Sequence, residues 1–237
     1  MKIDTSYKAD WTGGKDADMT DPILRDYHKL LWSKPLPDGR MFDLTVSSAP
    51  PYRLFHSSEI GTFSLSSDSI VHTYSRLKNG HMTEVVGSLP KHDIDAFYDL
   101  VCTIGAYLVF PSNKIDNKAT INVERGFNGL IKDRFDFTLE CIRRWYIGEK
   151  NPLRDCFDRY TDFFRLFTDF RGYVEFFLLD DIVDEDENVR FWLPFRDFGS
   201  TPPLPNSVTE YKEYMKNASD FTKARNKRMA AWAMTLP

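Results

Sequence analysis

The sequence predicts an α+β fold, in which a small antiparallel sheet packs against a helical core with a long C-terminal helix. Between residues 40 and 87, short segments alternate apolar and polar residues, as strands with one solvent-exposed face do. Between residues 153 and 167, apolar residues recur every three or four positions, which indicates an amphipathic helix. Ser207 and Glu210 form a capping box, which predicts the start of the terminal helix. No change of composition separates these parts, so we expect one globular domain over residues 1–237.

The N-terminal half is predicted to contain one helix followed by the sheet. Residues 1–20 are polar and are expected to form a loop. Asp21 and Pro22 are typical of a helix start, because the acid can cap the first turn and proline fits within it. This helix is expected to end before Pro35. Residues 40–87 are interpreted as β structure, with strands at 41–46, 52–55, 62–65 and 69–75.

The C-terminal half is predicted to be mainly helical, with one buried strand at 107–110. The acidic run 184–187 is expected to form the tip of a hairpin between Val183 and Val189. A further strand is expected at 191–195, before a linker at 202–205 that is rich in proline. Helices are expected from Asp93 to about Ile104, over 121–132, over 134–147, from Asn151 to Phe170 and over 171–183.

The composition argues against several classes of protein. The 237 residues are 42% hydrophobic and 15% aromatic, so a disordered chain is excluded. The net charge of −4 argues against binding to nucleic acid or to an anionic membrane, because both require a basic surface. No apolar run approaches the roughly 18 residues of a membrane span, and the N-terminus does not resemble a secretory signal. Cys102, Cys141 and Cys156 fall in apolar helical patterns, so we expect reduced, buried thiols and a cytoplasmic location.

Sequence motifs of common catalytic and nucleotide-binding sites are missing. The chain contains neither of the glycine-rich phosphate loops and no nucleophile elbow. Gly13-Gly14-Lys15 is a fragment of such a loop but is predicted to belong to the polar N-terminal segment. The five histidines do not occur at metal-ligand spacing, so no metal ion or cofactor is expected. His56, His72 and His81 could still meet an acidic residue in space, although a single histidine is more often structural.

The helix predicted over 134–147 carries the strongest candidate site. Apolar residues occupy two of its sides and leave a narrow polar stripe between them. The interpretation that the sequence favours is a ladder of internal ion pairs, because opposite charges lie one or two turns apart. The other interpretation is the floor of a cleft, where these arginines, joined by Arg125 and Arg134, bind a phosphate or a carboxylate. The polar stripe consists of Asp136, Glu140, Arg143 and Arg144.

A hydroxyl-rich segment over 64–69 lies at the end of a predicted strand. Its hydroxyl groups could bind a sugar or a phosphate, or they could satisfy the backbone of a turn. Ser66 and Ser67 from this segment, together with His28, therefore join the candidate ligand-binding residues. No residue is assigned a catalytic role.

Four specific motifs lie between residues 24 and 144, within a resemblance that extends over nearly the whole chain. They are LRDYHKLLWSK at 24–34, FSLSSDSI at 63–70, TINVERGF at 120–127 and DRFDFTLECIRR at 133–144. In these motifs the chain resembles an uncharacterised bacterial family, the DUF6994 family. The resemblance implies a bacterial or phage-associated cytosolic protein. It implies no activity, fold or ligand, and it assigns no catalytic residue.

Three functions follow as expectations. The first is binding of a phosphorylated or nucleotide-like small ligand in an Arg/Asp/Glu-lined cleft, where Asp136 and Glu140 orient the arginines or act as a general base. Both a binding protein and an enzyme fit this description. The second is a non-enzymatic interaction or regulatory module, for example in bacterial conflict with phage, that uses Phe191-Trp192 or the terminal helix. The third is RNA binding through the basic residues at 223–228, which the acidic total charge disfavours.

Overall fold

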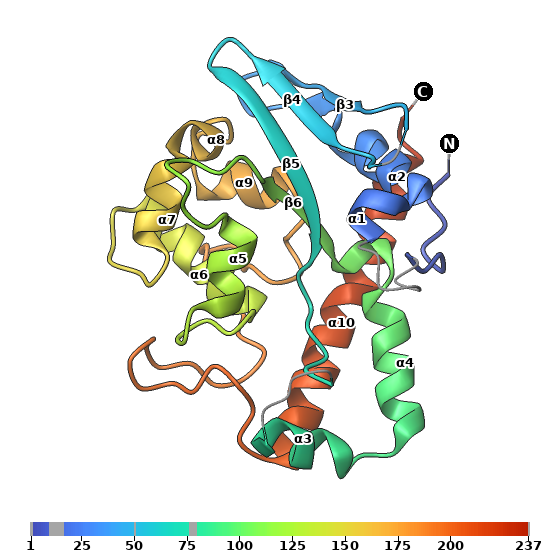
Figure 1. Ribbon diagram of the computed structural model, residues 1–237, viewed down its shortest axis with the longest axis vertical. Helices are drawn as coiled ribbons and strands as arrows, with labels where there is room; N and C mark the ends of the chain where they lie inside the picture. The colour runs from blue at the N-terminus through green and yellow to red at the C-terminus, as the bar shows by residue number, and fades with distance from the viewer. Residues whose placement is uncertain (1, 10–16, 50, 76–79, 237) are drawn as a thin grey trace.

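The computed structural model has the predicted α+β architecture, with a small antiparallel sheet, a helical core and a long C-terminal helix (Figure 1). It describes residues 2–9, 17–49, 51–75 and 80–236. The Gly13-Gly14-Lys15 segment lies outside the described residues. Among the helices of the described residues, none is long and apolar enough to cross a membrane.

The main sheet has four antiparallel strands in the order β3-β4-β5-β6. They are β3 (Leu44–Val46), β4 (Leu54–Ser58), β5 (Gly61–Ser69) and β6 (Tyr107–Pro111). The register of the last pair places Leu65 opposite Pro111 and Ser69 opposite Tyr107. All five residues of β6 are buried, as the apolar run predicted. A separate two-stranded ribbon pairs β1 (Lys34–Pro35) with β2 (Met41–Phe42).

Two helices in the first quarter of the chain pack beside the sheet, α1 (Ala17–Thr20) and α2 (Pro22–Trp32). Asp21 caps α2 as predicted, since its carboxylate accepts a hydrogen bond of 3.0 Å from the backbone N–H of Leu24. The predicted loop over residues 1–20 therefore needs correction, because its last turn is helical. Residues 80–87, which were predicted to be β structure, form α3 (Gly80–Gly87), and α4 (Lys91–Val101) follows.

The helices of the C-terminal half enclose an aromatic core. They are α5 (Ile121–Phe127), α6 (Phe135–Tyr146), α7 (Arg154–Arg159), α8 (Thr161–Arg165) and α9 (Phe170–Phe176). Phe167 lies at the centre of this core, with its ring centroid 5.0 Å from that of Phe176 and 5.3 Å from that of Tyr173. The abundance of phenylalanine in the sequence is therefore used mainly to bury area.

The terminal helix α10 (Val208–Ala233) runs along the molecule beside α4 (Figure 1). It also packs against a short 3-10 helix, η2 (Ile104–Ala106). Gly105 allows this close approach, because a Cβ atom there would lie 2.6 Å from the backbone oxygen of Thr222. Its backbone N–H donates a hydrogen bond of 2.8 Å to the side chain of Asn226.

Two predicted helices are shorter in the structure. The helix expected from Asn151 to Phe170 is divided into α7 and α8 at Tyr160, whose hydroxyl donates a hydrogen bond of 2.8 Å to the backbone oxygen of Asn113. The helix expected over 121–132 ends at Phe127 in α5. Lys132 and Asp133 then adopt positive φ angles of 46° and 62°, which a helix does not accommodate.

The helix expected over 171–183 corresponds to α9 and ends at Phe176. Beyond it Leu178 has a φ of 54°, and the carbonyls of Phe177 and Leu178 accept hydrogen bonds from the buried guanidinium of Arg225. Arg225 therefore satisfies carbonyl groups that a continuing helix would have paired internally. The predicted hairpin tip is confirmed by an antiparallel bridge between Val183 and Val189.

Two predicted strands are absent from the described residues. At 191–195, the backbone of Trp192 is satisfied by side chains, since its N–H donates to Asp136 at 2.9 Å and its carbonyl accepts from Asn217 at 2.8 Å. Over 69–75, β5 ends at Ser69. The carbonyl of His72 there accepts a hydrogen bond of 2.7 Å from the hydroxyl of Tyr214 instead of a strand partner.

Replacing the cap of the terminal helix is expected to destabilise the protein moderately. The Ser207 hydroxyl accepts a hydrogen bond of 3.1 Å from the backbone N–H of Glu210, and the Glu210 carboxylate accepts one of 2.6 Å from the N–H of Asn206. Ser207→Ala should lower the free energy of unfolding by about 1 kcal/mol, measured by urea denaturation. Ser88→Ala, at an exposed position after α3, serves as the control and should change it by less than about 0.5 kcal/mol. Equal losses in both variants would contradict a capping role.

Candidate functional site

The first part of the polar stripe is sealed inside the protein. Arg134 and Asp136 are both fully buried and form a two-point ion pair, in which Nε donates to Oδ1 at 2.8 Å. Asp136 also accepts a hydrogen bond from the backbone of Trp192, and Arg134 donates one of 3.2 Å to the carbonyl of Pro203. The fork of Arg134 is therefore already occupied by a carboxylate and a carbonyl.

The second part of the stripe is a carboxylate shared by two arginines. Glu140 accepts two hydrogen bonds from Arg143, at 2.8 and 2.9 Å, and one from Arg144 at 2.7 Å. Both arginine side chains are about a quarter exposed, while Glu140 is buried. This is the arrangement that the ion-pair ladder interpretation predicts.

The remaining candidates on β5 and α2 lie in buried hydrogen-bond networks. His28 Nε2 lies 2.7 Å from the hydroxyl of Ser67, and Nδ1 accepts a hydrogen bond of 3.1 Å from the indole of Trp32. Burial, together with the charges of two nearby arginines, lowers the pKa of His28 well below its usual value, so its imidazole is neutral at pH 7. Ser66 is next along β5 and accepts a hydrogen bond of 2.9 Å from the amide of Asn122.

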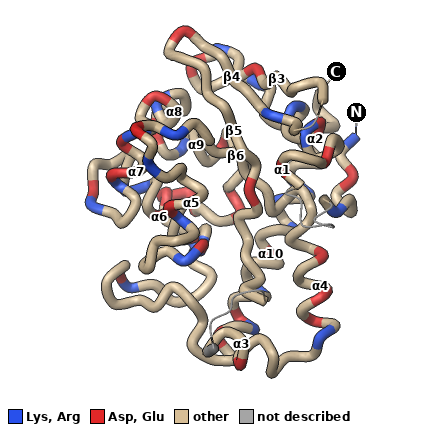
Figure 2. Tube along the Cα trace, viewed as in Figure 1, with Lys and Arg blue, Asp and Glu red and all other residues tan. Residues whose placement is uncertain are grey.

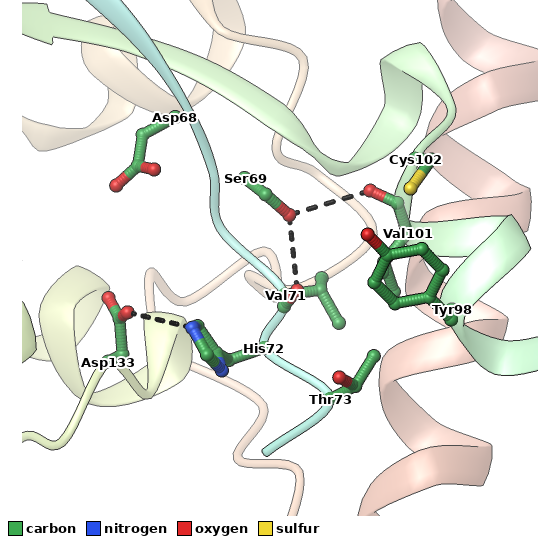
Figure 3. A pocket seen from close by; sticks show the side chains of 9 residues that line it. All are labelled: Asp68, Ser69, Val71, His72, Thr73, Tyr98, Val101, Cys102 and Asp133. Atoms are coloured by element: carbon green, nitrogen blue, oxygen red, sulfur yellow. Dashed lines mark hydrogen bonds and ion pairs between the residues drawn. The ribbon is translucent and has the colours of Figure 1, made fainter. Parts of the chain in front are cut away.

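A cleft of about 270 Å³ lies where β5 ends (Figure 3). It is bounded by the segment that follows β5, by α4 and by the loop that precedes α6. One side carries the polar side chains of Asp68, His72 and Asp133, and Tyr98 and Val101 lie on the opposite side (Figure 3). The cleft therefore offers a polar wall and a largely apolar wall to a small molecule.

Arg125 organises the polar wall of this cleft from behind. Its guanidinium is completely buried and lies 2.7 Å from the carboxylate of Asp68 and 3.2 Å from that of Asp133. Burial alone would lower the pKa of Arg125, but Asp133 and Asp68 hold this pKa above its ordinary value, so the group stays charged. Its Nη2 atom faces Asp133 in the second of these ion pairs, and its Nε atom is buried without a hydrogen-bond acceptor among the described residues. Arg125 therefore fixes two carboxylates from separate elements.

His72, the third member of the polar wall, contacts both Asp133 and the backbone. Its Nε2 is 3.5 Å from Oδ2 of Asp133, and its Nδ1 is 3.4 Å from the backbone N–H of Tyr74. The tautomer that satisfies both contacts carries its proton on Nε2, as assigned from this network. Burial lowers the pKa of His72 despite the nearby Asp133 carboxylate, so the ring is neutral at pH 7. Its role here is to orient Asp133 and to add a polar surface.

The backbone around the cleft is strained. Tyr74 has a φ of 55°, in the left-handed region that bulky side chains rarely adopt, and Asp133 has a φ of 62° in the same region, which aspartate adopts more readily. The two segments are joined, since the Tyr74 hydroxyl donates a hydrogen bond of 3.0 Å to the carbonyl of Lys132, which also has a positive φ. Strain of this kind costs about 1–3 kcal/mol for each residue and is concentrated at functional sites in proteins.

The charge balance of the polar wall determines what it can bind. Among Asp68, Asp133, Arg125 and the neutral imidazole of His72, the carboxylates outnumber the guanidinium by one. Asp68 and Asp133 are hydrogen-bond acceptors, so the complementary ligand group is a hydrogen-bond donor, such as an amine or a set of hydroxyl groups. Tyr98 supplies an aromatic surface on the other side.

Of the residues that the sequence singled out as ligand-binding, Arg125 contacts residues of this cleft. Asp68 belongs to the hydroxyl-rich segment, and Asp133 directly precedes Arg134, but neither was singled out. The sequence suggested His72 only as part of a possible cluster of His56, His72 and His81 with an acidic residue. His56 instead is buried against Phe42, with ring centroids 4.0 Å apart. The polar wall could not be assembled from spacing, because Asp68 and His72 lie far from Asp133 in the chain.

The comparisons with known proteins give a family and no activity. A family model described as a family of unknown function, DUF6994, matches residues 1–229. No curated protein and no solved structure matches the chain significantly. The function therefore has to be argued from the site itself.

Proposed function

The chain belongs to the DUF6994 family of unknown function, and we propose from its own geometry that it binds a small ligand rich in hydrogen-bond donors. The ligand would be an amine or a polyhydroxy compound, seated in the cleft between Asp68, Asp133 and Tyr98. The observation that carries this proposal is that one buried arginine, Arg125, holds two carboxylates from different elements at the wall of a cleft. Such convergent polar groups in an otherwise apolar cleft are typical of small-molecule sites.

The strained backbone supports the same proposal. A positive φ at Tyr74 lowers stability, and Tyr74 lies beside the cleft, directly after the lining residue Thr73. The positive φ of Asp133 places its carboxylate between Arg125 and His72. A structural ion pair alone does not require this conformation, because Asp68 already neutralises Arg125.

The phosphorylated ligand that the sequence suggested has less support in this cleft. A phosphate would meet the carboxylates of Asp68 and Asp133, which line the cleft, whereas the Arg125 guanidinium is buried and does not line it. The arginines of the polar stripe are likewise engaged by Asp136 and Glu140. The charge balance favours an uncharged or cationic ligand over an anionic one.

Ligand binding can be tested by thermal shift over paired compounds. The panel contains nucleosides and amino sugars, each beside its phosphorylated form, because binding stabilises the native state by mass action. We expect the unphosphorylated member of a pair to raise the melting temperature more. Asp68→Asn should weaken binding at least about tenfold, since it removes one of the two carboxylates. Titration calorimetry of the best compound measures this loss.

Asp99→Asn is the matched control for Asp68→Asn, because Asp99 is an exposed acid of α4 that pairs with Lys8. It should leave binding unchanged. The proposal fails if no compound of the panel stabilises the protein, or if the two variants bind equally well. Tighter binding of the phosphorylated members would instead support the anion site suggested by the sequence.

The two alternative functions, protein–protein interaction and RNA binding, differ in how well the structure supports them. Trp192 is buried and Phe191 stacks on Phe195 at 4.1 Å, so they do not form an exposed aromatic patch.

A different apolar stripe is exposed on and after α5, where Phe127 is 84% accessible, and this favours protein binding as a second candidate function. Phe127→Ser should then abolish self-association or partner binding in size-exclusion chromatography without changing the melting temperature. The stripe contains Val123, Phe127 and Leu130.

RNA binding has the least support of the three functions. Arg225 is fully buried and Arg228 pairs with Asp181, so the basic cluster of the terminal helix keeps mainly its lysines at the surface. Basic and acidic positions are interspersed around α7 and α8 (Figure 2). We also propose a bacterial setting, as the resemblance in the sequence implies, and a cytoplasmic location, supported by the three buried free cysteines, which suit a reducing compartment.

A further inference from the structure

A second cavity, of about 300 Å³, lies between the β1–β2 ribbon, α9 and the end of α10. Lys34 of β1 lines this cavity, although its side chain is largely withdrawn from solvent. Its Nζ lies 4.7 Å from the ring centroid of Phe176, 4.9 Å from that of Trp232 and 5.3 Å from that of Trp32. The described residues provide no ion-pair or hydrogen-bond partner for Nζ. The amine is therefore held in an aromatic cage that opens onto a cavity.

The surroundings of Lys34 favour its uncharged form. Burial in the cage lowers the pKa of Lys34 to about 7, and the positive charge of Arg225 acts in the same direction. Asp180 opposes this shift, and Glu175 provides the other charged group that lines the cavity. Near neutral pH a large fraction of the amine therefore has a free electron pair, whereas an exposed lysine is almost fully protonated.

We propose that Lys34 is a nucleophilic amine that forms an imine with an aldehyde or ketone entering this cavity. A lysine desolvated in an apolar pocket beside another cation is the arrangement in which lysine acts as a nucleophile towards carbonyl compounds. Pro35, Pro37, Phe176 and Trp232 line the cavity with apolar surface. They select a carbonyl compound with an apolar or aromatic body.

The reaction balances without any further reagent. The Nζ electron pair attacks the carbonyl carbon, the carbonyl oxygen gains the proton that nitrogen loses, and a carbinolamine forms. This intermediate then loses its hydroxyl group together with the remaining proton on nitrogen as water, leaving a C=N bond on Lys34. The water can leave through the mouth of the cavity, where Glu175 is exposed.

The proposal is tested by trapping the imine in the full-length protein. The protein is incubated at pH 7 with benzaldehyde and sodium cyanoborohydride, and peptide mapping by mass spectrometry measures the modification rate of each amine. We expect Lys34 to be modified at least about tenfold faster than Lys29, an exposed lysine of α2 that serves as the internal comparison. The Lys34 rate should rise with pH and level off just above pH 7. Equal rates, or modification of Lys34 only after denaturation, would overturn the proposal.

Trp232→Ala separates activation of the amine from simple access to it. Trp232 is partly exposed near the end of α10, so its truncation opens the cage to water. Activation by the cage predicts a slower modification of Lys34 at pH 7 and a midpoint at higher pH. Faster modification at pH 7 would overturn the proposal, because the cage would then only hinder the reagent. Circular dichroism verifies that the variant is folded, and the comparison of Lys34 with Lys29 in the unaltered protein does not depend on it.

Discussion

Asp136→Asn is expected to destabilise the protein by about 3–5 kcal/mol, a large part of the stability of a typical domain. Asparagine has nearly the same shape as aspartate, so the substitution removes the charge and leaves the packing. The guanidinium of Arg134 would then be buried without a counter-ion, since both members of the pair are fully inaccessible to water. Urea denaturation, followed by circular dichroism, gives the change in the free energy of unfolding.

Asp162→Asn is the matched control for this substitution. Asp162 belongs to an exposed pair with Arg165 on α8, at 4.0 Å, and such pairs contribute little to stability. The control should therefore change the free energy of unfolding by less than about 0.5 kcal/mol. If Asp136→Asn were equally mild, the polar stripe would not be a structural ladder. The ligand-binding interpretation of Arg134 and Asp136 would then regain support.

The sequence was most informative where one local pattern determines an element. The caps at Asp21 and Ser207, the apolar run of β6 and the acidic hairpin tip after Val183 all depend on neighbouring residues and are found in the structure. The two-sided apolar pattern of α6 likewise predicted a helix packed on both sides, and α6 is buried over its first eight residues.

Predictions failed where distant side chains satisfy the backbone. The carbonyl of Leu178 is paired by Arg225, 47 residues away, and the N–H of Trp192 is paired by Asp136, 56 residues away. A segment whose backbone groups are hydrogen-bonded by distant side chains needs neither a helical conformation nor a strand partner, whatever its intrinsic secondary-structure propensity.

The candidate site was predictable only in part for the same reason. Arg125 was singled out for its charge, but its partner Asp68 lies 57 residues earlier in the chain, at the end of β5. The cage of Lys34 is harder still to foresee, because Trp32 is adjacent in sequence whereas Trp232 comes from the end of α10. Lys34 precedes a proline in a short polar sequence, which resembles an ordinary surface turn.

Lys34→Met is expected to change the pH dependence of the free energy of unfolding much more than Lys29→Met does. The pKa of Lys34 is about 7 in the folded protein, against an ordinary lysine value of 10.5 in the unfolded chain. Between these values the unfolded chain binds a proton that the folded protein does not bind. The free energy of unfolding of the unaltered protein therefore rises in this window, by about 1.4 kcal/mol per pH unit. Below pH 7 the cost of burying the charged amine is present in full.

The measurable quantity is the difference in unfolding free energy between Lys34→Met and the unaltered protein. Methionine fills the cage without a charge, so this difference should favour the variant most at pH 6 and decline by about 2–3 kcal/mol by pH 9. Lys29→Met, at an exposed position, should give a difference that stays flat over the same range. A flat difference for Lys34→Met as well would show that the aromatic rings keep the amine charged, as a cation–π site does. Because this experiment contains no carbonyl compound, it separates the state of the amine from its reactivity: an uncharged Lys34 that forms no imine would leave a buried lysine without a nucleophilic role.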